Sequence, residues 1–123
     1  MCIFCDDFIN KKTPFLENEL ALAYFDEFPV SKGHAIIITK RHVETYFDTN
    51  KQEQDAMFSL LREAKEYVEK EYKPTGYNIG FNCGTDAGQS VMHVHLHLIP
   101  RYKGDVANPR GGIRGVIPSK KDY

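Results

Sequence analysis

The sequence lacks the features of a membrane, secreted or nucleic-acid-binding protein. It has no apolar run near the roughly 20 residues that a membrane span requires. Its first residues, MCIFCDDFINKK, lack the apolar stretch of a signal peptide. The formal net charge is only −1, and the three cysteines are an odd number, which argues against a disulfide framework. We therefore expect a cytoplasmic protein with no membrane or nucleic-acid partner.

The chain is long enough for one domain with a modest core. It has 123 residues, of which 41% are hydrophobic and 27% charged, as in ordinary globular proteins. We find no internal repeat or low-complexity tract. Residues 101–123 hold six Lys or Arg against two Asp. We therefore expect a single domain over 1–123, with a core over 2–102 and an extended basic tail over 103–123. This tail would either approach phosphates or remain solvated.

Hydrophobic periodicity and turn residues predict the secondary structure. Strands are expected over 19–28, 34–40, 77–82 and 93–100, and one long helix over 50–72. A capping box of Thr49 and Gln52 would begin this helix, and Pro74 with Gly76 would end it. The last two strands follow each other through a loop too short for a crossover helix. This order favours an α+β fold, with the long helix on one face of an antiparallel sheet.

Three of the five histidines alternate with apolar residues in HVHLHLIP, residues 93–100. On a strand, His93, His95 and His97 would project from one face. A His-x-His pair can bind a metal, but three in a row spread too far for one ion unless the strand bends. They could also be polar residues on a wet face. In the third interpretation, one neutral imidazole is a nucleophile whose second nitrogen is held by a hydrogen bond.

The loop before these histidines favours the third interpretation. Its sequence, GTDAGQS, includes Gly84 and Gly88, which allow close approach of a backbone to a ligand. It also includes Gln89 and Ser90, whose side chains can donate hydrogen bonds to an anion. A phosphate held beside an imidazole favours phosphoryl chemistry over metal-assisted hydrolysis.

These segments resemble the signature of the histidine-triad (HIT) family, His-φ-His-φ-His-φ-φ with φ apolar. The resemblance lies in GQSVMHVHLHLIPRY, KGHAIIITKRH and FNCGTDAGQS, and it covers most of residues 2–102. The C-terminal sequence is most similar to a bacterial-type branch related to dinucleoside polyphosphate hydrolases. The resemblance implies a sheet of about five strands, a short N-terminal helix, and a homodimer that continues the sheet across two subunits.

The same resemblance implies an activity. HIT proteins act on the α-phosphate of nucleotide conjugates through a nucleotidyl-histidine intermediate. The substrate would be a dinucleoside polyphosphate, such as Ap4A, or a nucleoside phosphoramidate, with adenine as the expected base. A nucleotidyl transferase and a nucleotide-binding regulator with little turnover are the alternatives.

Roles of individual residues follow from their matching positions in the family motif. His95 resembles the nucleophile, while His97 and His34 resemble the residues that orient it and relay protons. The matching phosphate contacts are Gln89 and Ser90. The other nucleotide-binding positions are Asp26 at the ribose, Asn82 and Gly88 near the phosphate, and Ile3, Phe4 and Tyr24 around the base.

The N-terminal sequence CIFC places Cys2 and Cys5 three residues apart. The two are either free thiols or ligands of a metal, and a metal needs two more ligands. Some bacterial-type members of the family bind a structural zinc through such a pair, the His of a KxH segment and the first triad histidine. The resemblance therefore implies zinc bound by Cys2, Cys5, His42 and His93. Such a set would be closed, with no open position for chemistry.

Overall fold

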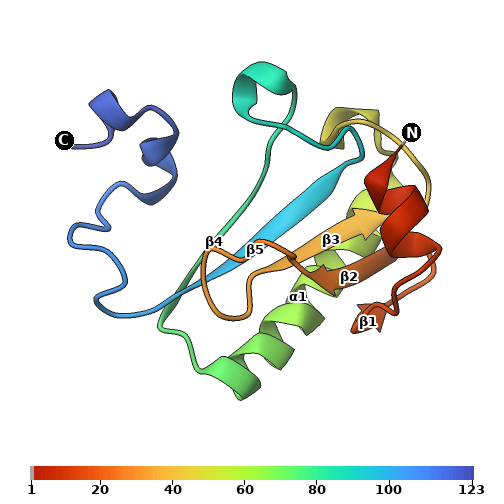
Figure 1. Cartoon of the computed structure of the whole chain (residues 1–123), viewed down its shortest axis with the longest axis horizontal. Helices are drawn as coiled ribbons and strands as arrows, with labels where there is room; N and C mark the ends of the chain where they lie inside the picture. The colour runs from red at the N-terminus through yellow and green to blue at the C-terminus, as the bar shows by residue number, and fades with distance from the viewer. Residues whose placement is uncertain (1) are drawn as a thin grey trace.

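One antiparallel sheet organises the molecule, a computed structural model that describes residues 2–123 (Figure 1). Neighbouring strands are all antiparallel, in the order β1-β2-β3-β5-β4. The strands are β1 (Leu16–Glu17), β2 (Ala21–Phe25), β3 (Ala35–Thr39), β4 (Gly76–Phe81) and β5 (His95–Arg101). The predicted α+β fold is confirmed, and β1 is a short additional edge strand. Strand β5 is last in the chain but lies between β3 and β4, so its side chains lie near the middle of the sheet.

The long helix α1 (Lys51–Tyr72) covers one face of this sheet. The buried residues of its apolar face, Met57, Leu60, Ala64 and Val68, recur every three or four positions. They pack against strand residues on one face of the sheet: Ala21, Ala23, Ala35, Ile37, Leu96 and Leu98. The predicted bounds are nearly correct, but the predicted capping box is wrong. The cap is formed by Asn50 and Glu53 instead, because the Thr49 hydroxyl donates to the carbonyl of Tyr46.

A short π-helical segment, η1 (Phe4–Ile9), covers part of the opposite face and confirms the predicted N-terminal helix. Its Phe4 and Phe8 pack on a second apolar cluster that includes Leu22, Tyr24, Ile36 and Ile38. The strand register pairs Ile36 with His97 and Ile38 with His95. Because paired residues lie on the same face, both histidines share the face of η1. The sheet therefore separates the core beneath α1 from the histidines.

The first triad histidine does not belong to the strand. β5 begins at His95, and His93 lies in a bend before it. The backbone N–H of Val94 donates to the carbonyl of Val43, in the loop after β3, at 2.8 Å. The expected strand over 93–100 is therefore wrong at its start. The bend is the feature that lets His93 take a different partner from His95 and His97.

The C-terminal residues 102–123 form two short 3-10 turns, η4 (Gly112–Val116) and η5 (Pro118–Lys120), beyond β4 (Figure 1). They are folded on themselves, so the expected extended tail is wrong. The guanidinium carbons of Arg110 and Arg114 lie 4.5 and 4.7 Å from the centroid of the Tyr123 ring. Arg114 also donates to the carbonyl of Lys120 at 2.8 Å. These contacts occupy both arginines within the tail.

No helix within residues 2–123 is long and apolar enough to cross a membrane.

Candidate active site and metal centre

A cavity of about 370 Å³ opens on the face of the sheet that carries His95 and His97. Ile36 of β3 shares its floor with these two histidines. Three walls surround the floor: η1 with the residue before it, the loop from β2 to β3, and the segment between β4 and β5. The residues of these walls are Ile3, Phe4 and Phe8; Asp26, Glu27 and Phe28; and Asn82, Gly88, Ser90 and Val91.

His95 is held in one tautomer. Its Nδ1 lies 2.9 Å from the carbonyl oxygen of His93. Since a carbonyl only accepts hydrogen bonds, Nδ1 carries the hydrogen and Nε2 keeps its lone pair. Burial lowers the pKa of His95 below its ordinary value, so the ring is neutral at pH 7. A neutral imidazole with a fixed orientation and a free lone pair is a suitable nucleophile.

His97 and His34 form a second, separate chain of hydrogen bonds. The Val30 N–H donates to Nδ1 of His34 at 3.1 Å, so the hydrogen of the neutral His34 ring is on Nε2. This Nε2 lies 3.0 Å from Nδ1 of His97 and donates to it. Burial lowers the pKa of His97 to about 4. His97 is therefore a neutral ring whose Nε2–H is left to donate to a ligand.

Asp26 lies beside His34, the first histidine of this series of hydrogen bonds. One carboxylate oxygen accepts from the Phe28 N–H at 2.8 Å, and the other lies 3.6 Å from Nε2 of His34. His34 itself is buried behind His97 and does not line the cavity. The structure thus brings His34, His95 and His97 together, with His34 behind His97 and hydrogen-bonded to it.

Gln89 does not reach the cavity. Its side-chain oxygen accepts from the Gly84 N–H at 2.8 Å, and its nitrogen donates to the carbonyls of Glu44 and Val91 at 2.6 and 3.0 Å. With both ends of the amide occupied, Gln89 holds the loop in shape, and the expectation that it contacts the phosphate is not met here. Ser90 does line the cavity, and the residue is exposed.

Of the three residues expected around the base, Ile3 and Phe4 line the cavity, but Tyr24 lies behind Phe8. Asn82 and Gly88, expected near the phosphate, also line the cavity. The Tyr24 hydroxyl donates to the carbonyls of Phe8 and Lys12 at 3.2 and 3.3 Å, so it supports the wall without facing a ligand. Sequence reasoning missed Phe8, which follows Phe4 by four residues on one helical face. It also missed Glu27 and Phe28, which directly follow Asp26.

A second cluster joins Cys2, Cys5, His42 and His93 beside the cavity. Nδ1 of His93 lies 3.4 and 3.5 Å from the sulfurs of Cys2 and Cys5, and 3.3 Å from Nδ1 of His42. Nε2–H of His93 donates to the carbonyl of Thr39 at 2.7 Å, which leaves Nδ1 free to bind a metal. Tetrahedral zinc with bonds of about 2.0–2.3 Å spaces its ligands by about 3.3–3.8 Å. The four residues therefore fit zinc.

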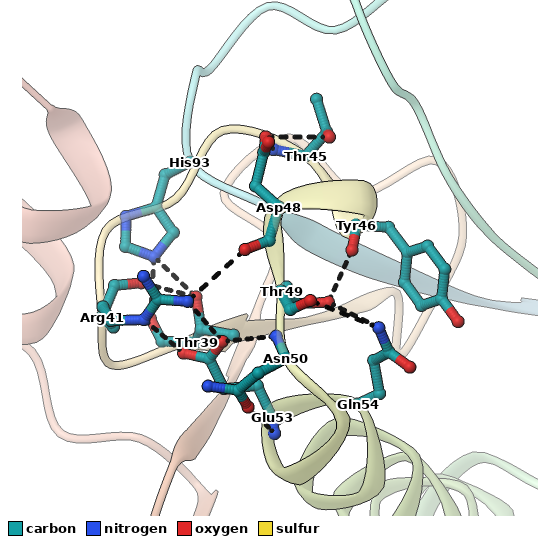
Figure 2. A network of polar contacts seen from close by, with 10 residues as sticks. All are labelled: Thr39, Arg41, Thr45, Tyr46, Asp48, Thr49, Asn50, Glu53, Gln54 and His93. Atoms are coloured by element: carbon teal, nitrogen blue, oxygen red, sulfur yellow. Dashed lines mark hydrogen bonds and ion pairs between the residues drawn. The ribbon is translucent and has the colours of Figure 1, made fainter.

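A network of polar contacts holds the segment between β3 and α1 (Figure 2). His42 lies in this segment. Arg41 donates through Nε and Nη2 to both carboxylate oxygens of Glu53, at 2.9 and 2.8 Å. The Thr39 hydroxyl donates to the carbonyl of Arg41 at 2.7 Å. Glu53 also caps α1, so the ligand loop is tied to the start of the helix. These contacts position the carbonyl of Thr39, which accepts the hydrogen bond from Nε2–H of His93.

The geometry agrees with comparison to known proteins. The model of the HIT domain matches residues 8–104. The chain belongs to the HIT family. This HIT protein is 38% identical over 104 residues to an uncharacterized HIT-like protein of Mycoplasma genitalium, covering 83% of this chain and 74% of that protein. It is 36% identical over 91 residues to the asymmetrical bis(5'-nucleosyl)-tetraphosphatase of Schizosaccharomyces pombe, covering 74% of this chain and 50% of that enzyme.

Among solved structures, the HIT protein resembles a zinc-bound histidine triad family protein from Mycobacterium smegmatis. The TM-score is 0.77 at 30% sequence identity, and the match covers 87% of this chain and 79% of that one. That structure is zinc-bound, and in this chain Cys2, Cys5, His42 and His93 form a cluster that could hold a metal ion within the same fold.

Proposed function

We propose that this HIT protein hydrolyses a nucleoside 5'-phosphate conjugate at its α-phosphate through a covalent nucleotidyl-histidine intermediate. The observation that carries the proposal is the hydrogen bond from His95 Nδ1 to the carbonyl of His93. It leaves Nε2 as an unprotonated nucleophile on the floor of a cavity with Ser90 on its wall. The phosphatase activity named for the fission-yeast relative supports the same class of reaction.

The reaction takes two displacements at phosphorus. In the first, the Nε2 lone pair of His95 forms a bond to the α-phosphorus, and the bond to the leaving group breaks. The leaving group takes a proton from solvent through the exposed Ser90 hydroxyl. In the second, water attacks the phosphorus, the phosphorus–nitrogen bond breaks, and the water proton returns to solvent. Throughout, Nδ1–H stays bonded to His93, and Nε2–H of His97 stabilises the phosphate charge.

A zinc ion, where bound, would be held by Cys2, Cys5, His42 and His93 and would stabilise the fold. With four protein ligands it would have no open position for substrate. Its consequence for the chemistry is indirect, because the carbonyl of His93 is the acceptor that orients His95. Fixing the ring of His93 therefore helps to hold His95 in the tautomer that carries its hydrogen on Nδ1.

The test is a substitution of the nucleophile. His95→Ala should lower kcat for a nucleoside phosphoramidate by several orders of magnitude, because no covalent intermediate can form. Nucleotide binding should persist, since the remaining walls of the cavity are intact. Rapid quenching of the native protein with radiolabelled substrate should trap about one nucleotidyl group per chain in the first turnover. Hydrolysis by His95→Ala near the native rate would refute the mechanism, whereas turnover only with an added acceptor would indicate a transferase.

We also propose that the protein is a homodimer joined at β4. Within the described chain this strand pairs only with β5, so no strand pairs with its outer edge, although Gly112 and Ile113 of η4 lie near Asn78 and Gly80 of β4. Between β4 and α1 lies a hollow of about 430 Å³ whose apolar lining includes Phe58, Leu61, Tyr77 and Ile79. Ile79 is 49% exposed and Phe58 is 44% exposed. A second copy pairing along this edge would extend the sheet and bury these side chains.

A further inference from the structure

One corner of the cavity has no part in the chemistry above. Glu27 lines the cavity, and Lys12 forms an ion pair with it. The ammonium of Lys12 also lies 4.1 Å from the centroid of the Phe8 ring. The other carboxylate of the lining, Asp26, is turned toward His34 and the Phe28 N–H. Glu27, in the loop from β2 to β3, and Lys12, just after η1, thus form a separate charged pair at one corner of the cavity.

The strand register shows how far this corner lies from β5, the strand that carries the proposed nucleophile. His97 of β5 pairs with Ile36 of β3, which in turn pairs with Tyr24 of β2. Neighbouring strands are about 4.8 Å apart, so this line crosses about 10 Å of the sheet. The Phe8 ring lies over Tyr24, with 5.2 Å between the centroids. A nucleotide whose phosphate lies at His95 and Ser90 would therefore place its base near Phe8, with an outer edge at the charged pair.

We propose that Glu27 and Lys12 read the edge of the base and favour guanine. This inference rests on the proposed function in placing the phosphate at His95. Lys12 contacts one carboxylate oxygen of Glu27. An ionised carboxylate has about four lone-pair sites, so both oxygens can still accept hydrogen bonds from a ligand. Guanine fits this pair because its N1–H and 2-amino group donate to the carboxylate while its 6-oxo group accepts from the ammonium.

Other bases complement the pair less well. Adenine has one donor for the carboxylate, its 6-amino group, and one acceptor for the ammonium, its N1 nitrogen. It therefore makes one charge-assisted contact fewer than guanine. A pyrimidine has only one ring and extends less far toward the corner. The proposed preference departs from the adenine that the family resemblance led us to expect.

The experiment compares nucleotide affinities and tests the pair by substitution. Calorimetry should show GMP binding about tenfold tighter than AMP, the ratio typical of one bidentate contact. Glu27→Gln replaces one acceptor oxygen with an amide donor and should bring this ratio close to one. Lys12→Ala, which leaves the carboxylate in place, should lower it partially. The matched control is Glu17→Gln, whose carboxylate pairs with Lys40 at 3.3 Å on the distant edge strand β1 and should leave the ratio unchanged.

Equal affinities for GMP and AMP in the native protein would overturn the proposal. So would an unchanged ratio in Glu27→Gln. Because the ratio comes from binding alone, it does not depend on turnover. A native protein that prefers GMP but hydrolyses neither guanosine nor adenosine 5'-phosphoramidate would support this inference and refute the proposed function.

Discussion

At the scale of single residues, two histidines on one face of β5 have opposite hydrogen-bonding roles. His95 donates through Nδ1 to a backbone carbonyl and keeps its Nε2 lone pair. His97 accepts through Nδ1 from His34 and therefore carries its hydrogen on Nε2. The difference arises from the partner at Nδ1 rather than from the residue type. One ring is thus suited to attack phosphorus and the other to stabilise the charge that develops.

The buried state of His97 should be visible in the pH dependence of stability. Burial lowers its pKa to about 4 in the folded chain, against about 6.5 when unfolded. Between these values the unfolded chain binds a proton that the folded chain does not. The stabilisation is therefore fully present above pH 6.5 and is lost as the pH falls toward 4, by about 1–3 kcal/mol.

Urea denaturation at several pH values checks this expectation. His97→Asn cannot titrate, so its free energy of unfolding should fall less between pH 7 and 4.5 than that of the native protein. The exposed Asn10→Ala variant serves as the control and should follow the native curve. Parallel curves for His97→Asn and the native protein would contradict the prediction.

At the scale of elements, η1 contributes to both the metal centre and the cavity. Cys2 and Cys5 bring sulfur ligands to the cluster at the start of this segment. Phe4 contacts the rings of both His93 and His95, with 5.9 and 5.0 Å between centroids. A six-residue segment has little stability alone. We therefore expect η1 to depend on the metal for its position.

Removing the metal should test this dependence. Elemental analysis of the purified protein should find about one zinc per chain, and Cys5→Ala should lose it. Burial and the neighbouring Cys2 raise the pKa of Cys5 to about 11 without metal, so zinc binding should release protons. A strong chelator should lower Tm of the native protein by several degrees.

Cys83→Ala is the matched control, because Cys83 is a free cysteine outside the cluster. It should retain the metal and melt as the native protein does. A native protein that contains no zinc and melts identically with and without the chelator would exclude the site.

At the scale of the whole molecule, the core beneath α1 lies on one face of the sheet and the proposed active site on the other. The edge of β4 that no strand pairs with is where the proposed dimer would form. The proposed dimer predicts that native protein sediments at twice the mass of one 14.1 kDa chain. Ile79→Glu would place a charge in the buried interface and should give monomers. Val30 lies in the loop between β2 and β3 and is 71% exposed. The Val30→Glu variant should therefore remain dimeric. A native protein that sediments as a monomer at micromolar concentration would contradict the proposal.

The sequence predicted those features that depend on local pattern. Helix periodicity located α1, and alternation placed His95 and His97 together on one face. Sequence reasoning failed where the contacts of a residue depend on partners far away in the chain. Gln89 is occupied by the carbonyl of Glu44, 45 positions away, and the Val94 N–H is occupied by Val43. Neither partner has a signature in the sequence, because a backbone carbonyl is available on every residue.

The span of the metal cluster sets the order in which the protein can mature. Cys2 and His93 are 91 positions apart in the chain, although the Cys2 sulfur and Nδ1 of His93 lie 3.4 Å apart. During synthesis the ribosome releases the two cysteines long before it adds the histidine, and β5 follows later still. The thiols must therefore stay reduced and unpaired while most of the chain is made. Neither the cluster nor the floor of the cavity can form before β5 emerges, so the proposed reaction cannot begin on a nascent chain.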